Sequence, residues 1–216
     1  MQAMDVAAMM RRMEDVGAPS EDAHDFDRLF REDGPGVWRT IYAFTQHSGF
    51  PDLVDRECTL IVSAMEMFWG LNSKSTGSFD YTDADSIVDW AQQHKKKVRG
   101  HNLIWHEQTP KWFKSIDSRA EAEKRFTEHV QQMCSRFAGR MQSWDVVNEA
   151  IFPNDEKPGS LRESIFYKLM GPEYLDIAFR TARAADPKAL LVYNEYNLEC
   201  DIDFHEKRRR AIIELI

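Results

Sequence analysis

Cysteine is scarce in this sequence, and no two cysteines fall at a metal-binding or redox spacing. The 216 residues include only three, Cys58, Cys134 and Cys200, which lie far apart. The absence of a Cys-x-x-Cys pair argues against a thiolate metal site or a dithiol redox motif. We therefore expect these cysteines to be buried thiols that pack as small apolar side chains.

The sequence also lacks an excess of positive charge and any long apolar run. Its formal net charge is −8, which gives a nucleic-acid partner little electrostatic support. No run approaches the roughly 20 apolar residues that cross a bilayer. Met1 to Gly17 contains no basic segment followed by an apolar stretch, so we expect no signal peptide there. On this basis the chain is either intracellular or has a leader that this sequence does not include.

What is present is the composition of a globular protein, 43% hydrophobic and 30% charged. Residues 1–36 differ in pattern from the rest. Apolar residues from Val6 to Met13 recur at helical spacing, and Gly34-Pro35-Gly36 breaks the chain. We predict an N-terminal extension at 1–36, formed by a short helix and a loop, and one main domain at 37–216.

After Gly36, short apolar runs typical of strands alternate with helical patterns. This alternation predicts a parallel sheet built from about five right-handed β/α units, which places the chain in the α/β class. The predicted strands are Trp38–Thr45, Leu60–Met67, Lys97–Asn102, Ser143–Asn148 and Ala189–Asn194.

The segments between these strands carry helix signals. Thr82 with Asp85, and Ser118 with Glu121, have the spacing of a capping box. Pro172 stands at a first-turn position of a helix predicted to run through Ala184. The helix after Ser118 has an apolar stripe that we expect to be buried, formed by Ala122, Phe126, Val130, Met133 and Phe137. A last helix is expected to start near Asp203.

Polar and aromatic side chains gather where the third, fourth and fifth predicted strands end. Because the carboxyl ends of parallel strands meet at one edge, these side chains should line one cleft. Amides, histidines, carboxylates and tryptophans together suit a sugar ligand, since rings stack on sugar faces and polar groups bind hydroxyls. The residues in question are His101, Trp105, His106 and Gln108, then Asn148 and Glu149, then Asn194.

Each of these residues also has an ordinary structural interpretation. His101 and His106 are of the type that binds metal, but the chain has no His-Glu-x-x-His helix, so we expect no metal site. Glu149 alone could be a solvated loop carboxylate, and Trp105 and Trp112 could be core residues. The ordinary interpretation is stronger for most residues taken singly, and the cleft interpretation is stronger for the three strand ends together.

Four ordered motifs resemble glycoside hydrolase family 10, whose best-known members are endo-β-1,4-xylanases. The resemblance runs from about Ile41 to the C-terminus, and the fourth-strand motif is the most specific. The motifs are Phe79-Asp-Tyr-Thr-Asp-Ala-Asp85, Arg99-Gly-His-Asn-Leu-Ile-Trp-His106, Trp144-Asp-Val-Val-Asn-Glu-Ala150, and Ala178-Phe-Arg-Thr-Ala-Arg followed by Tyr193-Asn-Glu-Tyr-Asn-Leu-Glu199.

The resemblance implies a (β/α)8 barrel of the TIM type that hydrolyses β-1,4-xylan with retention of configuration, without a cofactor. Retention needs two carboxyl groups roughly 5–5.5 Å apart. The resemblance makes Glu149 the general acid/base and Asn148 the ligand of the sugar 2-hydroxyl. It places the substrate contacts at Trp69, His101, Trp105, His106, Gln108 and Asn194. The implied ligand is a xylan-like polysaccharide or oligosaccharide.

Two departures from the family pattern bear on activity. The family nucleophile is a glutamate on the seventh strand, and the only similar stretch, around Glu214, lies in a helical context. We therefore expect an incomplete barrel whose nucleophile is missing from this chain. On the second strand, Ala64, Met65 and Phe68 replace polar sugar ligands of the family, which should weaken or alter polymer binding.

Two functional hypotheses follow. The first is a xylan-type glycoside hydrolase that uses Glu149. The alternative is an inactive fragment or pseudoenzyme that binds carbohydrate or a partner chain. The incomplete barrel leaves three explanations open: a fragment of a longer product, a second chain that supplies the missing strands, or residues 1–36 partly covering the gap. A metal-dependent barrel hydrolase is a weaker third hypothesis.

Overall fold

The computed structural model describes residues 54–56, 58–63, 65–199 and 203–215, which all belong to the unit Ser48–Ile216. The strands are β1 (Leu60–Val62), β2 (Lys97–Trp105), β3 (Ser143–Asn148) and β4 (Leu190–Asn194). The α-helices are α5 (Trp69–Asn72), α6 (Thr82–Gln93), α7 (Arg119–Arg136), α8 (Ile165–Met170), α9 (Tyr174–Ala185) and α10 (Asp203–Leu215). Short 3-10 helices are η1 (His106–Gln108), η2 (Phe113–Ser115), η3 (Pro153–Asp155) and η4 (Pro158–Ser160).

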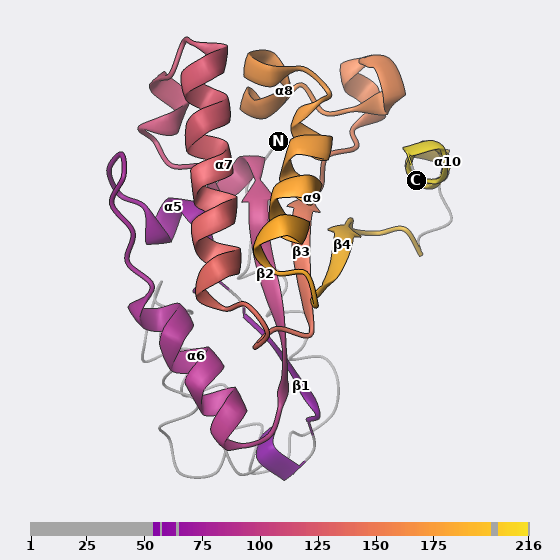
Figure 1. The fold of residues 1–216 in the computed structure, drawn as a ribbon. Helices are drawn as coiled ribbons and strands as arrows, with labels where there is room; N and C mark the ends of the chain where they lie inside the picture. Colours follow the sequence, from indigo (N-terminus) through magenta and orange to yellow (C-terminus); the bar gives the residue numbers. More distant parts are fainter. Residues whose placement is uncertain (1–53, 57, 64, 200–202, 216) are drawn as a thin grey trace, which may run out of the picture. The chain divides into compact units, whose positions relative to one another are not determined.

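The four strands form one parallel sheet in the order β1-β2-β3-β4 (Figure 1). This confirms four of the five predicted strands and the α/β class. The second predicted strand is shorter than expected, since β1 ends at Val62. The first predicted strand, Trp38–Thr45, and the predicted extension at 1–36 lie outside the described residues, so the boundary at Gly36 stays a prediction.

Helices α6, α7 and α9 cover one face of the sheet (Figure 1). The core lies between these helices and the strands, and the predicted stripe of α7 is fully buried there. Two features fix the fit of the layers. A Cβ on Gly100 would lie 2.2 Å from the Trp144 ring, so only glycine allows this close approach. The Trp144 indole N–H donates to Asp186 Oδ2 at 3.1 Å.

Of the two predicted capping boxes, the N-cap of one is confirmed. The Ser118 hydroxyl accepts the Glu121 N–H at 3.5 Å at the start of α7. The prediction for Thr82 and Asp85 was wrong, because Thr82 is already the first residue of α6 and no side chain caps Tyr81. The carboxylate of Asp80 instead accepts both the N–H and the hydroxyl of Thr82.

The predicted first-turn position of Pro172 was also wrong, since α9 begins at Tyr174 with Glu173 as its N-cap, and Pro172 lies two residues before the helix. In the part of the chain that the structure describes, no helix is both long enough and apolar enough to cross a membrane.

The pairing of β2 with β3 and of β3 with β4 is irregular at the same level of the sheet. The register shifts between His101 and Ile104 on β2, and between Asp145 and Val147 on β3. Such bulges reverse the side-chain alternation beyond them. They therefore decide which residues at the strand ends face the same side.

Candidate functional site

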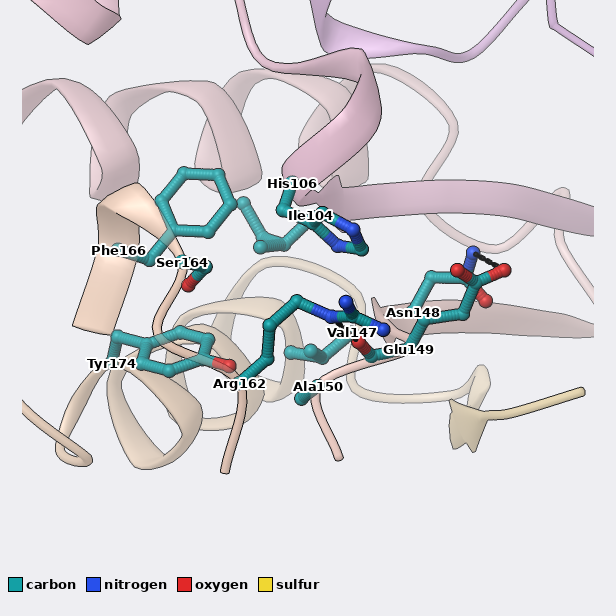
Figure 2. A pocket seen from close by; sticks show the side chains of 10 residues that line it. All are labelled: Ile104, His106, Val147, Asn148, Glu149, Ala150, Arg162, Ser164, Phe166 and Tyr174. Carbon is teal, nitrogen blue, oxygen red and sulfur yellow. Dashed lines mark hydrogen bonds between the residues drawn. The ribbon is translucent and has the colours of Figure 1, made fainter. Parts of the chain in front are cut away.

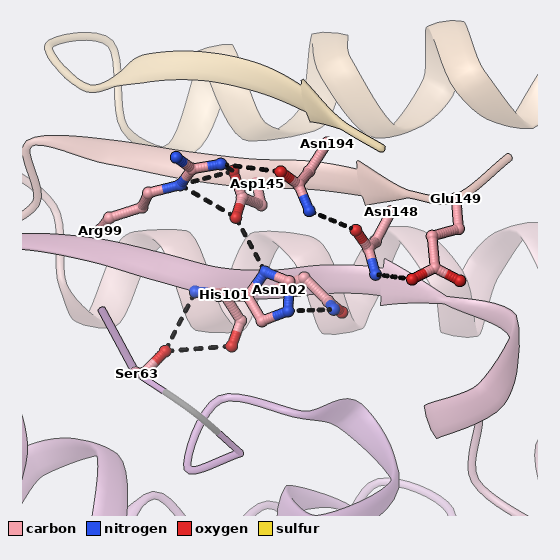
Figure 3. Close-up of polar contacts among 8 residues, drawn as sticks. All are labelled: Ser63, Arg99, His101, Asn102, Asp145, Asn148, Glu149 and Asn194. Atoms are coloured by element: carbon pink, nitrogen blue, oxygen red, sulfur yellow. Dashed lines mark hydrogen bonds and ion pairs between the residues drawn. The ribbon is translucent and has the colours of Figure 1, made fainter. Parts of the chain in front are cut away.

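A continuous chain of polar side chains runs across β2, β3 and β4 to Glu149 after the end of β3 (Figure 3). Arg99 donates from Nε and Nη2 to both oxygens of Asp145, at 2.7–3.0 Å. Its Nη2 also donates to Asn194 Oδ1 at 3.0 Å. Asn194 Nδ2 donates to Asn148 Oδ1 at 2.7 Å, and Asn148 Nδ2 lies 3.5 Å from Glu149 Oε1. The guanidinium thus fixes both amide orientations in sequence, so that Asn148 presents its N–H groups to Glu149.

The bulge in β3 makes this chain possible. Asp145 and Asn148 are three residues apart, so a regular strand would point their side chains to opposite faces. The register shift between them places both on the face that carries Arg99 and Asn194.

His101 belongs to the same cluster. Its Nδ1 lies 2.8 Å from Asp145 Oδ2, and because the carboxylate can only accept, Nδ1 carries the proton. The Nε2 atom is then an acceptor, 3.5 Å from Asn102 Nδ2. The Ser63 hydroxyl holds the backbone of His101 through its N–H and its carbonyl oxygen, each at 3.0 Å. The ring therefore has a fixed tautomer and a fixed place on the sheet face.

Glu149 stands at the end of β3, half-buried, with its backbone in the left-handed region at φ +56°. For a glutamate this conformation costs free energy, and it is found mostly where surrounding contacts impose it. The Trp105 indole N–H donates to Glu149 Oε2 at 3.1 Å. The strained residue thus carries a carboxyl group that is aimed by a tryptophan from the neighbouring strand.

The pKa of Glu149 is raised above its usual value. Burial is the main cause, because it disfavours the charged form. The hydrogen bond from Trp105 lowers this pKa, the negative charge of Glu195 raises it, and the positive charges of Arg162 and Arg208 lower it. A carboxyl group with a raised pKa keeps its proton at higher pH, as a general acid requires.

The backbone around Glu149 is held from several directions. Its N–H donates to the carbonyl oxygen of Asn194 at 2.9 Å, and its carbonyl oxygen accepts Arg162 Nε at 2.9 Å. Arg162 also packs over the Phe152 ring, 4.5 Å from its centroid. These contacts over-determine the left-handed turn.

A small cavity of about 10 Å³ lies against this turn (Figure 2). Core side chains such as Val147 and Phe166 form part of its wall, together with His106, Arg162 and Tyr174. Burial and the charge of Arg162 lower the pKa of His106 to about 3, so this imidazole is neutral at pH 7. The residues that line this cavity therefore pack against Glu149 and do not form a binding site for a sugar.

The structure brings His101, Trp105, Asn148, Glu149 and Asn194 together, and places His106 directly behind them. Gln108 ends η1 nearby, and within the described residues its side chain makes no hydrogen bond.

Trp69 is not part of this group, contrary to the expectation from the resemblance. It is the first residue of α5, which turns its indole into the core, where 2% of its surface is exposed. It stacks there on His129, with ring centroids 4.4 Å apart. A side chain so buried offers no face to a sugar.

Sequence reasoning missed the residues that orient this site, above all Arg99, Asp145 and Arg162. Asp145 lies within the fourth-strand motif, and a charged residue in an otherwise apolar strand was a usable signal. Nothing local pointed to Arg162, which reaches Glu149 from 13 residues further along the chain.

The segment that follows β1 places an apolar ring, that of Phe68, beside the site. The Phe68 ring packs edge-on against His101 and Trp105, with centroids 5.8 and 5.4 Å away. Within the described residues, no group of three or more histidine, cysteine, aspartate or glutamate side chains is arranged to hold a metal ion.

This geometry can be compared with known proteins. The profile of glycosyl hydrolase family 10 matches residues 29–216. The chain belongs to that family. Solved relatives in family 10 share the fold: xylanase 10B from Thermotoga petrophila, determined in complex with xylobiose, matches with a TM-score of 0.69 and 32% identity over 80% of this chain. XynB from Paenibacillus barcinonensis gives a TM-score of 0.70 at 30% identity over 81% of this chain. The described strands are thus part of a (β/α)8 barrel of the TIM type.

Curated relatives in family 10 include endo-1,4-beta-xylanase 3 of Hypocrea jecorina, 44% identical over 62% of this chain. Endo-1,4-beta-xylanase 2 of Claviceps purpurea is 32% identical over 88% of this chain. This chain covers 37% and 57% of those two proteins, and 53% of each of the two solved structures. It thus spans about half the length of these relatives, or less.

Proposed function

We propose that this chain carries the acid/base half of a retaining site for β-1,4-linked xylan, with Glu149 as the proton donor. The observation that carries the proposal is the Glu149 carboxyl group itself. It is bonded to Trp105 on a strained turn, and burial favours its protonated form. A general acid that protonates a glycosidic oxygen needs this state and this fixed direction.

The neighbouring groups suit a sugar beside that carboxyl group. Asn148 is oriented by Asn194 and ultimately by Arg99, so its amide can hold a sugar 2-hydroxyl without reorganisation. His101 offers an acceptor at Nε2 because Asp145 holds the proton at Nδ1. Trp105 is half-buried and leaves part of its ring for contact with a sugar. Xylose polymers are favoured because the family relatives are xylanases.

We propose further that the nucleophile comes from a segment outside residues 54–215, either in this polypeptide or in a chain that completes the barrel. The described carboxylate whose charge acts on Glu149 is Glu195, and it is already bound by Tyr193. Glu214 is exposed on α10, beside the loop that contains Pro153.

The alternative is a chain that binds carbohydrate, or a partner chain, without turnover. The packing of Phe68 against His101 and Trp105 favours it, because an apolar ring occupies space beside the site where sugar hydroxyls need polar partners.

The test uses aryl β-xylobiosides and compares the wild type with Glu149→Gln, each in a barrel completed by the segment or chain that supplies the nucleophile. Replacing the acid should lower kcat for a poor leaving group by about 10²–10⁴-fold, the usual contribution of general acid catalysis. Glu123→Gln, an exposed carboxylate on α7, is the matched control and should leave kcat unchanged. Equal activity of Glu149→Gln and wild type would refute the proposal. Calorimetric binding of xylo-oligosaccharides without any turnover would establish the alternative.

A further inference from the structure

A tyrosine hydroxyl holds the peptide that follows Glu149. Tyr193 lies on β4, next to Asn194, and its side chain leaves the strand on the opposite side. Its hydroxyl accepts the Ile151 N–H at 3.1 Å and donates to Glu195 Oε2 at 2.7 Å. Asn194 reaches Asn148 from one side of β4, and Tyr193 reaches the turn from the other.

The direction of these two bonds follows from the chemistry of the groups. An ionised carboxylate can only accept, so the Tyr193 hydroxyl must donate its single proton to Glu195. The oxygen lone pairs of that hydroxyl are then available for the Ile151 N–H. Burial raises the pKa of Tyr193 well above its usual value, so the phenol keeps this proton.

Glu195 depends in turn on helix α10. Arg208 Nη2 lies 3.7 Å from Glu195 Oε1, and the two side chains are 0% and 1% exposed. The guanidinium also lies over the Tyr196 ring, 4.0 Å from its centroid, and donates to the Tyr196 carbonyl oxygen at 3.3 Å. A buried carboxylate without such a partner would carry an uncompensated charge, so Arg208 supports the carboxylate that binds Tyr193.

We propose that Tyr193 is a positioning residue for Glu149: with Glu195 and the α10 residue Arg208, it anchors Ile151 and so helps to keep Glu149 in the left-handed conformation that aims its carboxyl group at Trp105. Tyr193 need not touch the sugar, because it acts through the Ile151 N–H, two residues after the proton donor. The inference rests on the proposed role of Glu149 as the acid.

The first experiment measures amide hydrogen exchange at Ile151 by NMR, in the wild type and in Tyr193→Phe. Loss of the phenol oxygen should speed this exchange about tenfold, the value of one hydrogen bond of about 1.4 kcal/mol. Tyr167→Phe is the matched control, since the Tyr167 hydroxyl makes no hydrogen bond within the described residues. Unchanged exchange at Ile151 in Tyr193→Phe would overturn the proposal whatever the activity.

The second experiment compares two aryl β-xylobiosides, because a good leaving group departs without a proton and a poor one does not. Tyr193→Phe should lower kcat about tenfold for the poor leaving group, and much less for the good one, with KM unchanged. Equal losses on both substrates would mean a general structural defect, and the positioning role would be rejected.

The two proposals can fail separately. If the wild type shows no turnover in the completed barrel, the proposed function fails. The positioning role of Tyr193 is then tested by the exchange rate of the Ile151 amide, together with the pH titration of ¹³C-labelled Glu149. The titration curve of the Glu149 carboxyl signal should differ from the wild type in Tyr193→Phe and not in Tyr167→Phe. An unchanged titration curve in Tyr193→Phe would overturn the positioning role.

Discussion

Neighbouring residues on β3 belong to two different kinds of interior. Trp144 is fully buried among apolar side chains on the helix-covered face of the sheet. Asp145 is equally buried, at 1% exposure, but points to the other face and binds Arg99 and His101. On the first face the fit depends on volume, as Gly100 against Trp144 shows. On the second face it depends on the pairing of each donor with an acceptor.

The comparison predicts different responses to mutation. The apolar face should tolerate a change of shape if volume is kept. The polar face should not tolerate even an isosteric change that alters a donor or a charge, because the partner group is left unpaired in a buried place.

The largest effect is expected from Phe126→Ala on the apolar face. Phe126 is 0% exposed and contacts the rings of Phe166 and Tyr174, with centroids 5.5 and 6.3 Å away. Its truncation should lower the free energy of unfolding by about 3–5 kcal/mol, because it removes buried area and leaves a cavity. Urea unfolding measures this, and a loss below about 1 kcal/mol would mean that α7 does not pack as described.

Asp145→Asn should cost less, about 2–3 kcal/mol, although its volume is unchanged. The substitution removes the charge that pairs with Arg99, whose own side chain is 33% exposed and can partly turn to water. The matched variant on the other face is Leu103→Met, which keeps volume and should cost less than about 1.5 kcal/mol. Equal losses in the two variants would abolish the distinction between the faces.

His129 should make the stability of the apolar face depend on pH. Burial lowers the pKa of His129 from 6.5 to about 3. Below pH 6.5 the imidazole is therefore protonated in the unfolded chain but stays neutral in the folded chain. Stability is therefore complete above pH 6.5 and falls towards pH 3, by up to about 1.4 kcal/mol per pH unit.

His129→Phe keeps a ring on Trp69 and should make this pH dependence shallower, because its imidazole no longer contributes. His106, whose pKa is also about 3, acts in the same direction and remains in the variant. Unfolding at pH 7 and pH 5 compares the two proteins, and parallel curves would contradict the role of His129.

The smallest expected effect is an electrostatic one on the polar face. Glu195 raises the pKa of Glu149, while Arg208 lowers it. Glu195→Gln should therefore lower the pKa of Glu149 and move the basic limb of the pH–activity profile to lower pH. In Glu195→Gln/Arg208→Met both charges are gone, so the limb should lie between those of the single variant and the wild type. An upward shift in the single variant would reverse the assigned sign.

The sequence predicted the fold well because strand and helix periodicities survive packing. The stripe on α7 and the strand Ser143–Asn148 were read from apolar spacing alone, and both are observed as predicted. The capping box at Thr82 failed because Asp80, two residues earlier, competes for the same backbone N–H. A local motif cannot show which of two nearby acceptors binds.

The residues at the strand ends were found for a similar reason, since the end of a parallel strand is visible in sequence. The directions in which these side chains point could not be predicted from the sequence. Trp69 was expected in the cleft but lies in the core, because the start of α5 decides its direction. Arg162 and Tyr193 act through contacts 13 and 42 residues distant in sequence, with Glu149 and Ile151. No spacing rule records such contacts.

The two register shifts also set a limit on changes in chain length. Each adds one residue to a strand, near Leu103 in β2 and near Val146 in β3. Without the extra residue of β3, Asp145 and Asn148 would be two residues apart, and one of the two buried valines between them, Val146 or Val147, would be lost from the core. A single-residue deletion that a surface loop absorbs would at these two points change the pairing of the strand with its neighbour. In this chain the strands beneath the site therefore allow less change in length than the loops around it.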